Sequence, residues 1–283
     1  MEKKKFALVT GASSGLGNAL VQELRKGYTV FAGVRTEKDK QLFSGSSNAI
    51  PIILDVAKSE SIMEAVQLIS EITKEQGLFA LVNNAGINYL SAFELADENK
   101  ERQLFEVNLF GAMALIRAVL PLLHKNVSTT NTTAKIINVS SIGGVFGLPW
   151  ESSYHASKFA MIGFSQSLRY ELEHLNIAVC CFVPGGMKTN IFQKSVENSK
   201  SVIQNGTHQH FPFYQKNLRH MNSVMQSFDK SAAPAKKAAK KIANLLEQNK
   251  MPLKKYFGTD SVFIRIFTWL GLQGVLSKQF TVK

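Results

Sequence analysis

The sequence predicts an α/β protein built on a single doubly wound parallel sheet with helices on both faces. Short apolar runs alternate with helical patterns along most of the 283 residues, as in chained strand–helix–strand units. A hydrophobic content of 45% provides a sizeable core for a chain of this length. Glycine-rich and polar motifs follow the apolar runs directly, where parallel sheets bind ligands. We therefore expect residues 1–283 to form one domain.

Seven segments are predicted to be strands, six of them apolar runs and the last, Lys254-Lys255-Tyr256-Phe257, a mixed one. They cover residues 6–9, 28–34, 50–54, 79–82, 134–139, 177–183 and 254–257. Apolar residues at helical spacing predict helices between them, including long ones at about 97–124 and 151–174 and a basic one at 236–246. Residues 185–231 have no clear period, which predicts a substrate loop. A C-terminal extension follows from about 258 to 283.

A glycine-rich turn, residues 10–17, connects the first strand to the first helix. It reads Thr-Gly-Ala-Ser-Ser-Gly-Leu-Gly. Glycines allow close approach of a ligand, and the helix N-terminus offers free N–H groups to a phosphate. The spacing G-x-x-x-G-x-G differs from the commoner G-x-G-x-x-G, so an ordinary glycine turn is the alternative.

Two charged residues follow the next two strands. Arg35 ends the second strand, where an acid would hold the ribose hydroxyls of NAD and an arginine accommodates the 2′-phosphate of NADP. We therefore expect NADP(H) to be preferred, with NAD(H) as the second choice. Asp55, followed by Val56, ends the third strand and could bond an adenine amino group. The alternatives are a surface cation for Arg35 and a turn cap for Asp55.

Asparagines mark the fourth strand and the helix after it. Asn83-Asn84-Ala85-Gly86 closes the strand, where amide side chains can bridge neighbouring strand ends and small residues leave room for a cofactor. Asn108 lies inside the predicted long helix. Because asparagine is unfavourable there, it is expected to have a partner or a task.

Ser141, Tyr154 and Lys158 form the candidate catalytic group. Tyr154 and Lys158 are four residues apart and share a helix face. A nearby ammonium group lowers the pKa of a phenol, which would let Tyr154 exchange a proton with an alcohol or ketone. Ser141 follows the fifth strand and could bond the same substrate oxygen. A surface Tyr–Lys pair is the alternative for this motif alone.

Composition limits the partners and the compartment. The net charge is +12, but no nucleic-acid motif accompanies it. The adjacent Cys180 and Cys181 are expected to be buried free thiols, which suits a cytoplasmic protein. His208 and His210 lack the neighbours of a metal site, so no metal is predicted. The sequence has no uninterrupted run of 18 apolar residues, so no membrane span is expected. The first apolar run, residues 6–9, is too short for a signal peptide.

The tail, residues 262–276, is rich in aromatic and aliphatic side chains and follows the basic helix. It could pack on the core, contact another subunit, or lie on a membrane surface. We keep peripheral membrane contact open on this basis.

These motifs together resemble the short-chain dehydrogenase/reductase family, which has a Rossmann-type fold, along nearly the whole chain. Residues 10–17 resemble its cofactor motif, 83–86 its sheet-stabilising motif, and 184–189 the motif around the nicotinamide. The resemblance implies four catalytic residues: Asn108, Ser141, Tyr154 and Lys158.

The same resemblance implies a role for each catalytic residue. Tyr154 would be the general acid or base, and Ser141 would polarise the substrate carbonyl. Lys158 would bind the nicotinamide ribose and lower the tyrosine pKa, and Asn108 would support a water-mediated proton relay. The implied cofactor contacts are Gly11, Ser13, Ser14, Gly15, Leu16, Gly17, Arg35, Asp55, Val56, Asn83, Asn84, Ala85, Gly86, Tyr154, Lys158, Pro184, Gly185 and Thr189.

Residues 30–35 and the long C-terminal region are more similar to the branch acting on steroids, retinoids and other lipophilic alcohols. The family also implies a homodimer or homotetramer formed through the helices at about 97–124 and 151–174. The sequence therefore predicts an oxidoreductase for a small hydrophobic alcohol or carbonyl compound. The alternative is a catalytically silent dinucleotide-binding protein with a regulatory or scaffold role.

Overall fold

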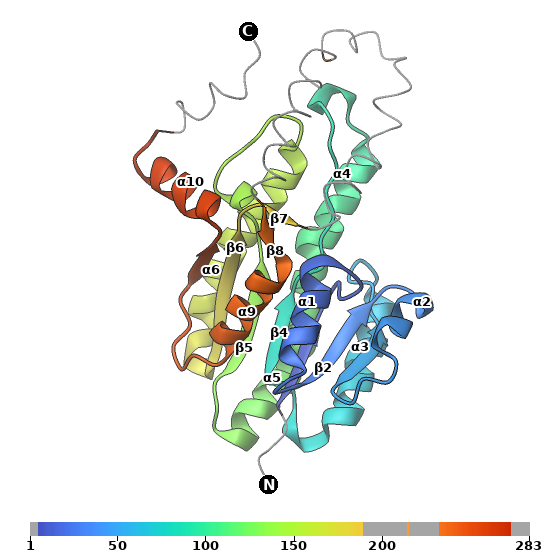
Figure 1. The fold of residues 1–283 in the computed structure, drawn as a ribbon. Coiled ribbons are helices and arrows are strands. Elements are labelled where there is room, and N and C mark those ends of the chain that lie inside the picture. Colours follow the sequence, from blue (N-terminus) through green and yellow to red (C-terminus); the bar gives the residue numbers. More distant parts are fainter. Residues whose placement is uncertain (1–4, 189–213, 215–231, 273–283) are drawn as a thin grey trace.

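A sheet of seven parallel strands forms the centre of the molecule (Figure 1), in the order β3-β2-β1-β4-β5-β6-β9. The structure is a computed structural model that describes residues 5–188, 214 and 232–272. The strands are β1 (Phe6–Val9), β2 (Thr29–Val34), β3 (Ala49–Ile53), β4 (Ala80–Asn83), β5 (Ala134–Val139), β6 (Ile177–Pro184) and β9 (Lys254–Phe257). Two further short strands, β7 (Met187–Lys188) and β8 (Ala233–Pro234), pair with each other outside this sheet.

The direction of winding reverses between β1 and β4. From β1 the chain proceeds outward through β2 to β3, and then crosses back to β4 on the other side of β1. The connections that leave β1 and β4 therefore diverge to opposite sides. A crevice opens at this point, outside the carboxyl ends of the strands.

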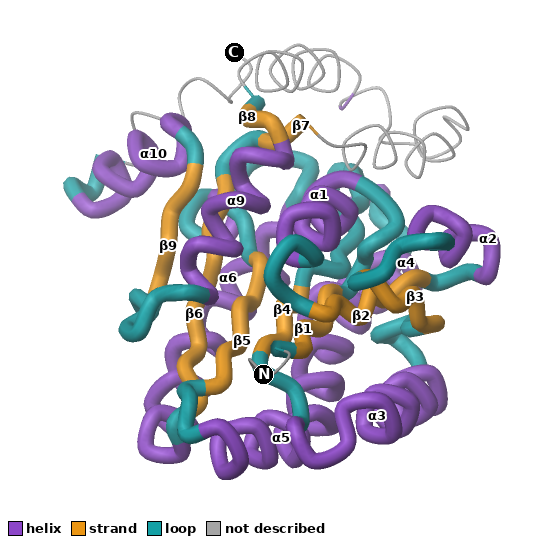
Figure 2. Tube along the Cα trace, turned by 60° about the horizontal axis from the view of Figure 1, so that its bottom comes forward, coloured by secondary structure: helices purple, strands orange, loops and turns teal. Residues whose placement is uncertain are grey.

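Helices cover both faces of the sheet, as predicted (Figure 2). They are α1 (Gly15–Leu24), α2 (Glu37–Lys40), α3 (Ser59–Thr73), α4 (Glu98–Phe105), α5 (Gly111–Thr130), α6 (Ser152–Leu172), α9 (Ala235–Leu246) and α10 (Thr259–Trp269). The apolar sides of α1 and α9 pack on one face, and those of α3, α5 and α6 pack on the other. The lysines of α9 face outward because its alanine, isoleucine and leucine side chains are buried against α1.

The predicted strands are confirmed to within one residue at each end, whereas the prediction of one helix over 97–124 was incomplete. The helical stretch contains a π-helical turn, Glu106–Phe110, between α4 and α5, and it continues to Thr130. The strands β7 and β8 were not predicted. Most of the predicted substrate loop, including His208 and His210, lies outside the described residues, as do residues 273–283.

Within the described residues, Glu98–Thr130 is long and apolar enough to cross a membrane by length and composition. In the structure, however, α5 lies along the sheet, and Leu115, Val119 and Leu123 are buried in the core beneath it. Part of the apolar surface of this helix is therefore buried inside the molecule.

Candidate active site

The glycine-rich turn lies between β1 and α1 and has the conformation that its glycines allow. Gly11 and Gly15 have φ angles of +65° and +53°, in the left-handed region. A side chain on Gly17 would place its Cβ 2.1 Å from the carbonyl oxygen of Gly11, so the helix can approach the turn only with glycine here. No side chain caps the first turn of α1, and that turn contains no acidic residue. Its N–H groups therefore remain available to an anion.

Arg35, Asp55 and Val56 line the cavity beside this turn. Arg35 is exposed, and within the described part of the chain its guanidinium forms no hydrogen bond or ion pair. Asp55 accepts a hydrogen bond from the backbone N–H of Ala57 at 3.1 Å through one carboxylate oxygen. The turn-capping alternative for Asp55 is thus correct, while the residue also borders the cavity.

The asparagines after β4 tie neighbouring strand ends together, as predicted. Asn83 donates to the Asn138 side chain at 2.9 Å, and Asn138 donates to Ser165 at 3.0 Å. Asn84 donates through its side chain to the carbonyl oxygen of Thr10 at 2.9 Å. The Thr10 hydroxyl in turn accepts the backbone N–H groups of residues 84 and 85, both at 2.9 Å. These bonds fix the glycine-rich turn against the end of β4.

Asn108 lies in the π-helical turn and is almost completely buried. Its side chain accepts the N–H of Ile87 at 2.8 Å, and it donates to the Ile87 carbonyl at 2.9 Å and to Ser157 at 3.1 Å. The expectation that Asn108 has a partner is confirmed: it holds the backbone that follows the Asn83–Gly86 motif. Such π-turns are common at functional sites.

Tyr154 and Lys158 lie on α6, and Ser141 begins the 3₁₀ turn Ile142–Gly144 after β5. The Lys158 ammonium group is 5.7 Å from the centre of the Tyr154 ring and donates to the Val139 carbonyl at 3.2 Å. Ser141 accepts the N–H of Gly143 at 3.1 Å through its hydroxyl oxygen. These three of the four predicted catalytic side chains border one cavity.

The expected decrease in the Tyr154 pKa is not found. Burial raises the pKa of Tyr154 to about 12, the hydrogen bond with Ser141 lowers it, and the nearby Glu151 carboxylate raises it. Burial also lowers the pKa of Lys158 to about 8. The physical reason for the error is that the sequence showed the helix spacing but not the depth of burial, which is the largest influence on this pKa.

Pro184 and Gly185 end β6 at the other side of the cavity. The carboxylate of Asp260, from α10, accepts the N–H of Gly186 at 2.6 Å. A Cβ on Gly185 would lie 1.9 Å from the same carboxylate, so a side chain there would displace the carboxylate of Asp260. Thr189, the last predicted contact of this motif, lies outside the described residues.

The cavity has a volume of about 690 Å³ and lies at the carboxyl ends of the strands. Of the predicted residues, those that line it are Gly11, Ser13, Ser14, Gly15, Leu16, Arg35, Asp55, Val56, Asn84, Ala85, Gly86, Ser141, Tyr154, Lys158, Pro184 and Gly185. Gly17, Asn83 and Asn108 do not line the cavity; they lie in the elements that form its wall. The cavity thus joins an anion-accepting helix end to a buried Ser–Tyr–Lys group, an arrangement that fits a nicotinamide dinucleotide.

Sequence reasoning missed several residues that border the same cavity. They are Asn88, Tyr89, Phe146, Glu151, His155, Asp260 and Ile264. Asp260 and Ile264 come from α10 and gave no local signal. Glu151 and His155 are four residues apart, as are Tyr154 and Lys158. This spacing could have predicted that Glu151 and His155 share one side of the helix. Among the described residues, no group of three His, Cys, Asp or Glu side chains could hold a metal ion.

Comparisons with known proteins agree with this arrangement. A family model described as short chain dehydrogenase matches residues 5–200. The uncharacterized oxidoreductase YusZ of Bacillus subtilis is 34% identical, covering 98% of both chains. Mouse estradiol 17-beta-dehydrogenase 2 is 39% identical over 194 residues, covering 66% of this chain. The chain spans about half, 49%, of that relative's length.

Two solved structures have the same fold over almost their whole length. A short-chain dehydrogenase from Streptomyces avermitilis has a TM-score of 0.77 and 27% identity, covering 98% of this chain and 96% of that one. A short chain dehydrogenase from Burkholderia cenocepacia, solved in complex with NADP, has a TM-score of 0.73 and 25% identity, covering 99% of each chain.

Proposed function

The chain belongs to the short-chain dehydrogenase/reductase family, whose members are NAD(P)-dependent oxidoreductases acting on CH–OH groups, and we propose that it interconverts a hydrophobic alcohol and its carbonyl compound with NADP(H). The proposal treats residues 1–283 as one dinucleotide-binding and catalytic domain. The observation that carries it is the single cavity that contains both the α1 helix end and Ser141, Tyr154 and Lys158.

In this proposal the reaction divides between cofactor and protein. The nicotinamide, when bound, supplies or accepts the hydride. Tyr154 donates a proton to the carbonyl oxygen in reduction or accepts the hydroxyl proton in oxidation. Since its pKa is raised to about 12, Tyr154 is protonated near neutral pH, which suits it as the acid of the reductive direction. Ser141 holds the substrate oxygen, Lys158 holds the ribose, and Asn108 fixes the adjoining backbone.

The proposal of a lipophilic substrate rests on the apolar side chains around the catalytic end. Ile142, Phe146, Leu148 and Ile264 border the cavity there. Relatives named estradiol 17-beta-dehydrogenase 2, retinol dehydrogenase 7 and 3-ketodihydrosphingosine reductase support this class of substrate. A first substrate panel should therefore contain a steroid ketone, retinaldehyde and a long-chain 3-keto compound, each assayed with NADPH.

Arg35 tests the cofactor preference. We expect Arg35→Ala to weaken NADPH binding about tenfold to a hundredfold, because one charge-assisted phosphate contact is removed, and to leave NADH binding nearly unchanged. Nicotinamide fluorescence during titration measures both affinities. Lys38→Ala, an exposed cation on α2 that does not line the cavity, is the matched control. Tighter binding of NADH by the unchanged protein would contradict the NADP preference.

Two further properties belong to the same proposal. Homodimer or homotetramer formation through α4, α5 and α6 is supported by Phe110, Phe159 and Tyr170, which are exposed on that side of the chain. Contact with an anionic membrane surface is supported by the outward face of α10, where Trp269 is 82% exposed and Phe263 54% exposed. The net charge of +12 favours anionic lipid over neutral lipid.

A further inference from the structure

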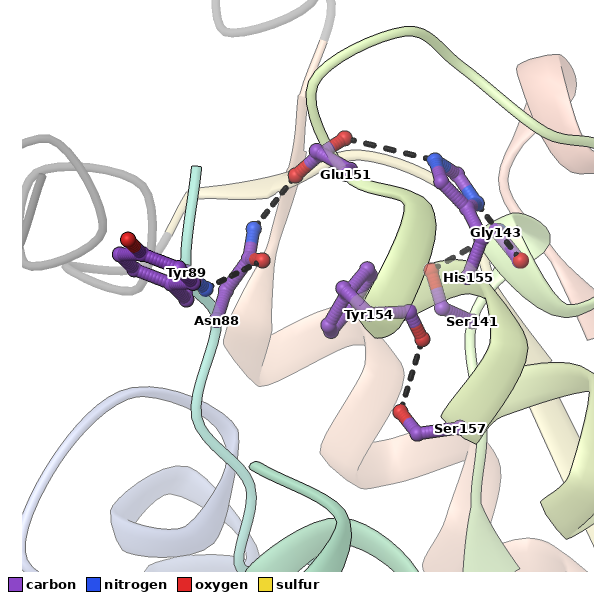
Figure 3. A network of polar contacts seen from close by, with 8 residues as sticks. All are labelled: Asn88, Tyr89, Ser141, Gly143, Glu151, Tyr154, His155 and Ser157. Carbon is purple, nitrogen blue, oxygen red and sulfur yellow. Dashed lines mark hydrogen bonds and ion pairs between the residues drawn. The ribbon is translucent and has the colours of Figure 1, made fainter. Parts of the chain in front are cut away.

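A chain of polar contacts borders the catalytic group and ends at Ser141 (Figure 3). Asn88, from the segment after β4, donates to one carboxylate oxygen of Glu151 at 2.5 Å. The other oxygen of Glu151 faces Nε2 of His155 at 3.5 Å. Nδ1 of His155 lies 2.7 Å from the carbonyl oxygen of Gly143. The N–H of Gly143 then donates to the Ser141 hydroxyl at 3.1 Å.

The chemistry of each partner fixes the direction of these hydrogen bonds. A carbonyl oxygen can only accept, so Nδ1 of His155 must carry a hydrogen and donate it to Gly143. The Asn88 side chain is oriented as well, because its oxygen accepts the N–H of Tyr89 at 2.7 Å and only its nitrogen remains for Glu151. At the far end, Gly143 occupies a lone pair of the Ser141 oxygen. The Ser141 hydrogen therefore occupies one of the other two positions on the oxygen, from which it can be donated to Tyr154 or to a substrate oxygen.

The network is also confined by packing. Asn88, Glu151 and His155 are each exposed by less than a tenth, so little of their surface is open to bulk water. His155 lies directly against the loop, since a Cβ on Gly143 would be 2.7 Å from Nδ1. Nε2 of His155 makes no hydrogen bond within the described residues, and the Glu151 carboxylate, 3.5 Å away, is the group that faces it. This carboxylate attracts the ring when Nε2 carries a hydrogen as well, as it does in the imidazolium form.

Helix geometry explains why these residues lie beside the catalytic ones. Glu151, the residue just before α6, is four residues from His155, and Tyr154 is four residues from Lys158, so the start of α6 places two such pairs side by side. One pair faces the reacting position, and the other faces the loop that carries Ser141.

We infer that His155 and Glu151 are positioning residues for Ser141. Glu151 orients the imidazole, His155 holds the carbonyl of Gly143, and Gly143 holds the Ser141 hydroxyl so that its hydrogen can be donated to the reacting oxygen. This inference rests on the proposed function, since it needs Ser141 to act on the substrate.

Two substitutions at His155 separate this role from simple packing. The amide nitrogen of asparagine can take the place of Nδ1, whereas that of glutamine takes the place of Nε2. Both variants lose the ring and its packing. We expect His155→Asn to keep kcat within about threefold, whereas His155→Gln should lower kcat about tenfold to a hundredfold, as small misplacements of catalytic groups do. The affinity for NADPH should stay unchanged in both.

A double-mutant cycle with Ser141→Ala provides the decisive readout. If His155 acts through Ser141, His155→Gln should lower kcat less than twofold in the Ser141→Ala background. The assay is NADPH consumption with the ketone from the substrate panel that the unchanged protein reduces fastest. His174→Gln, an exposed histidine after α6, is the matched control and should have no effect.

Each outcome decides one question. Equal losses in His155→Asn and His155→Gln, or fully additive losses with Ser141→Ala, would overturn the positioning role. Full turnover by Ser141→Ala alone would instead contradict the proposed function. If the His155 variants do not fold, Glu151→Leu tests the same chain from its other end. It should lower kcat about tenfold or more, and this loss should again disappear in the Ser141→Ala background.

Discussion

At the scale of single residues, Lys158 is held in an environment that opposes its charge. It is 5% exposed, and burial lowers its pKa from 10.5 to about 8. Between these two pH values the unfolded chain binds more protons at this residue than the folded protein does. The free energy of unfolding therefore rises with pH through that window, and below about pH 8 the full cost of burying the charge is present.

Replacing this lysine should stabilise the protein without added dinucleotide. We expect Lys158→Met to raise the free energy of unfolding at pH 7 by up to about 3 kcal/mol, because lowering the pKa from 10.5 to about 8 corresponds to that cost. The gain should shrink as the pH rises from about 8 to 10.5. Urea unfolding of both proteins across this range measures it, with the exposed Lys240→Met as control. A gain that does not change with pH would show that the buried charge is not its source.

Residues within one helix or one turn could be predicted from the sequence, and those that meet across the fold could not. Tyr154 and Lys158 were found because a spacing of four places them on one helix face. Asp260 contacts the backbone of Gly186 from 74 positions away, and no local pattern connects them. The pKa of Tyr154 was predicted in the wrong direction because its burial depends on the complete fold.

At the scale of elements, the approach of α1 to the end of β1 creates the anion-accepting end of the cavity. This approach depends on Gly17, which faces the carbonyl oxygen of Gly11. The sequence predicted this turn and the seven strands of the central sheet, because glycine spacing and short strand-like segments are local signals. It did not predict the π-helical turn around Asn108, since a π-turn inserted into a helix leaves the apolar period almost unchanged.

Two helical glycines offer a matched test of this packing. Gly17→Ala should lower the free energy of unfolding by about 2 kcal/mol through overpacking and weaken NADPH binding at least tenfold. Gly163→Ala, in α6, has open space around the added carbon and should instead stabilise the protein by about 0.5–1 kcal/mol. Urea unfolding and NADPH titration give both quantities. Normal NADPH binding by Gly17→Ala would contradict the account of the turn.

At the scale of the whole molecule, α10 connects the cavity to the outer surface. Asp260 and Ile264 face the cavity, whereas Val262, Phe263 and Trp269 are exposed. The sequence left three alternatives for the tail, and the described part of α10 combines core packing on one side with an exposed apolar face on the other. Under the proposed membrane contact, a lipophilic substrate in the membrane would meet this apolar helix next to the cavity.

The proposed membrane contact predicts sedimentation with vesicles that contain phosphatidylserine at low salt, and weaker sedimentation with neutral vesicles. Replacing Phe263 and Trp269 together by serine should reduce binding at least tenfold, since two exposed aromatic side chains no longer enter the interface. Phe93→Ser, at another exposed phenylalanine, should bind normally. Equal sedimentation of all three proteins would exclude α10 as the contact.

The most direct test of the account compares Tyr154→Phe with the unchanged protein in two assays, NADPH binding and NADPH-dependent reduction of the ketone panel. The account predicts that the variant binds NADPH with nearly the same affinity and loses turnover at least a hundredfold, because the aromatic ring stays and only the proton donor is removed. Undiminished turnover by the variant would contradict Tyr154 as the general acid. Binding without turnover by the unchanged protein would instead favour a regulatory or scaffold role.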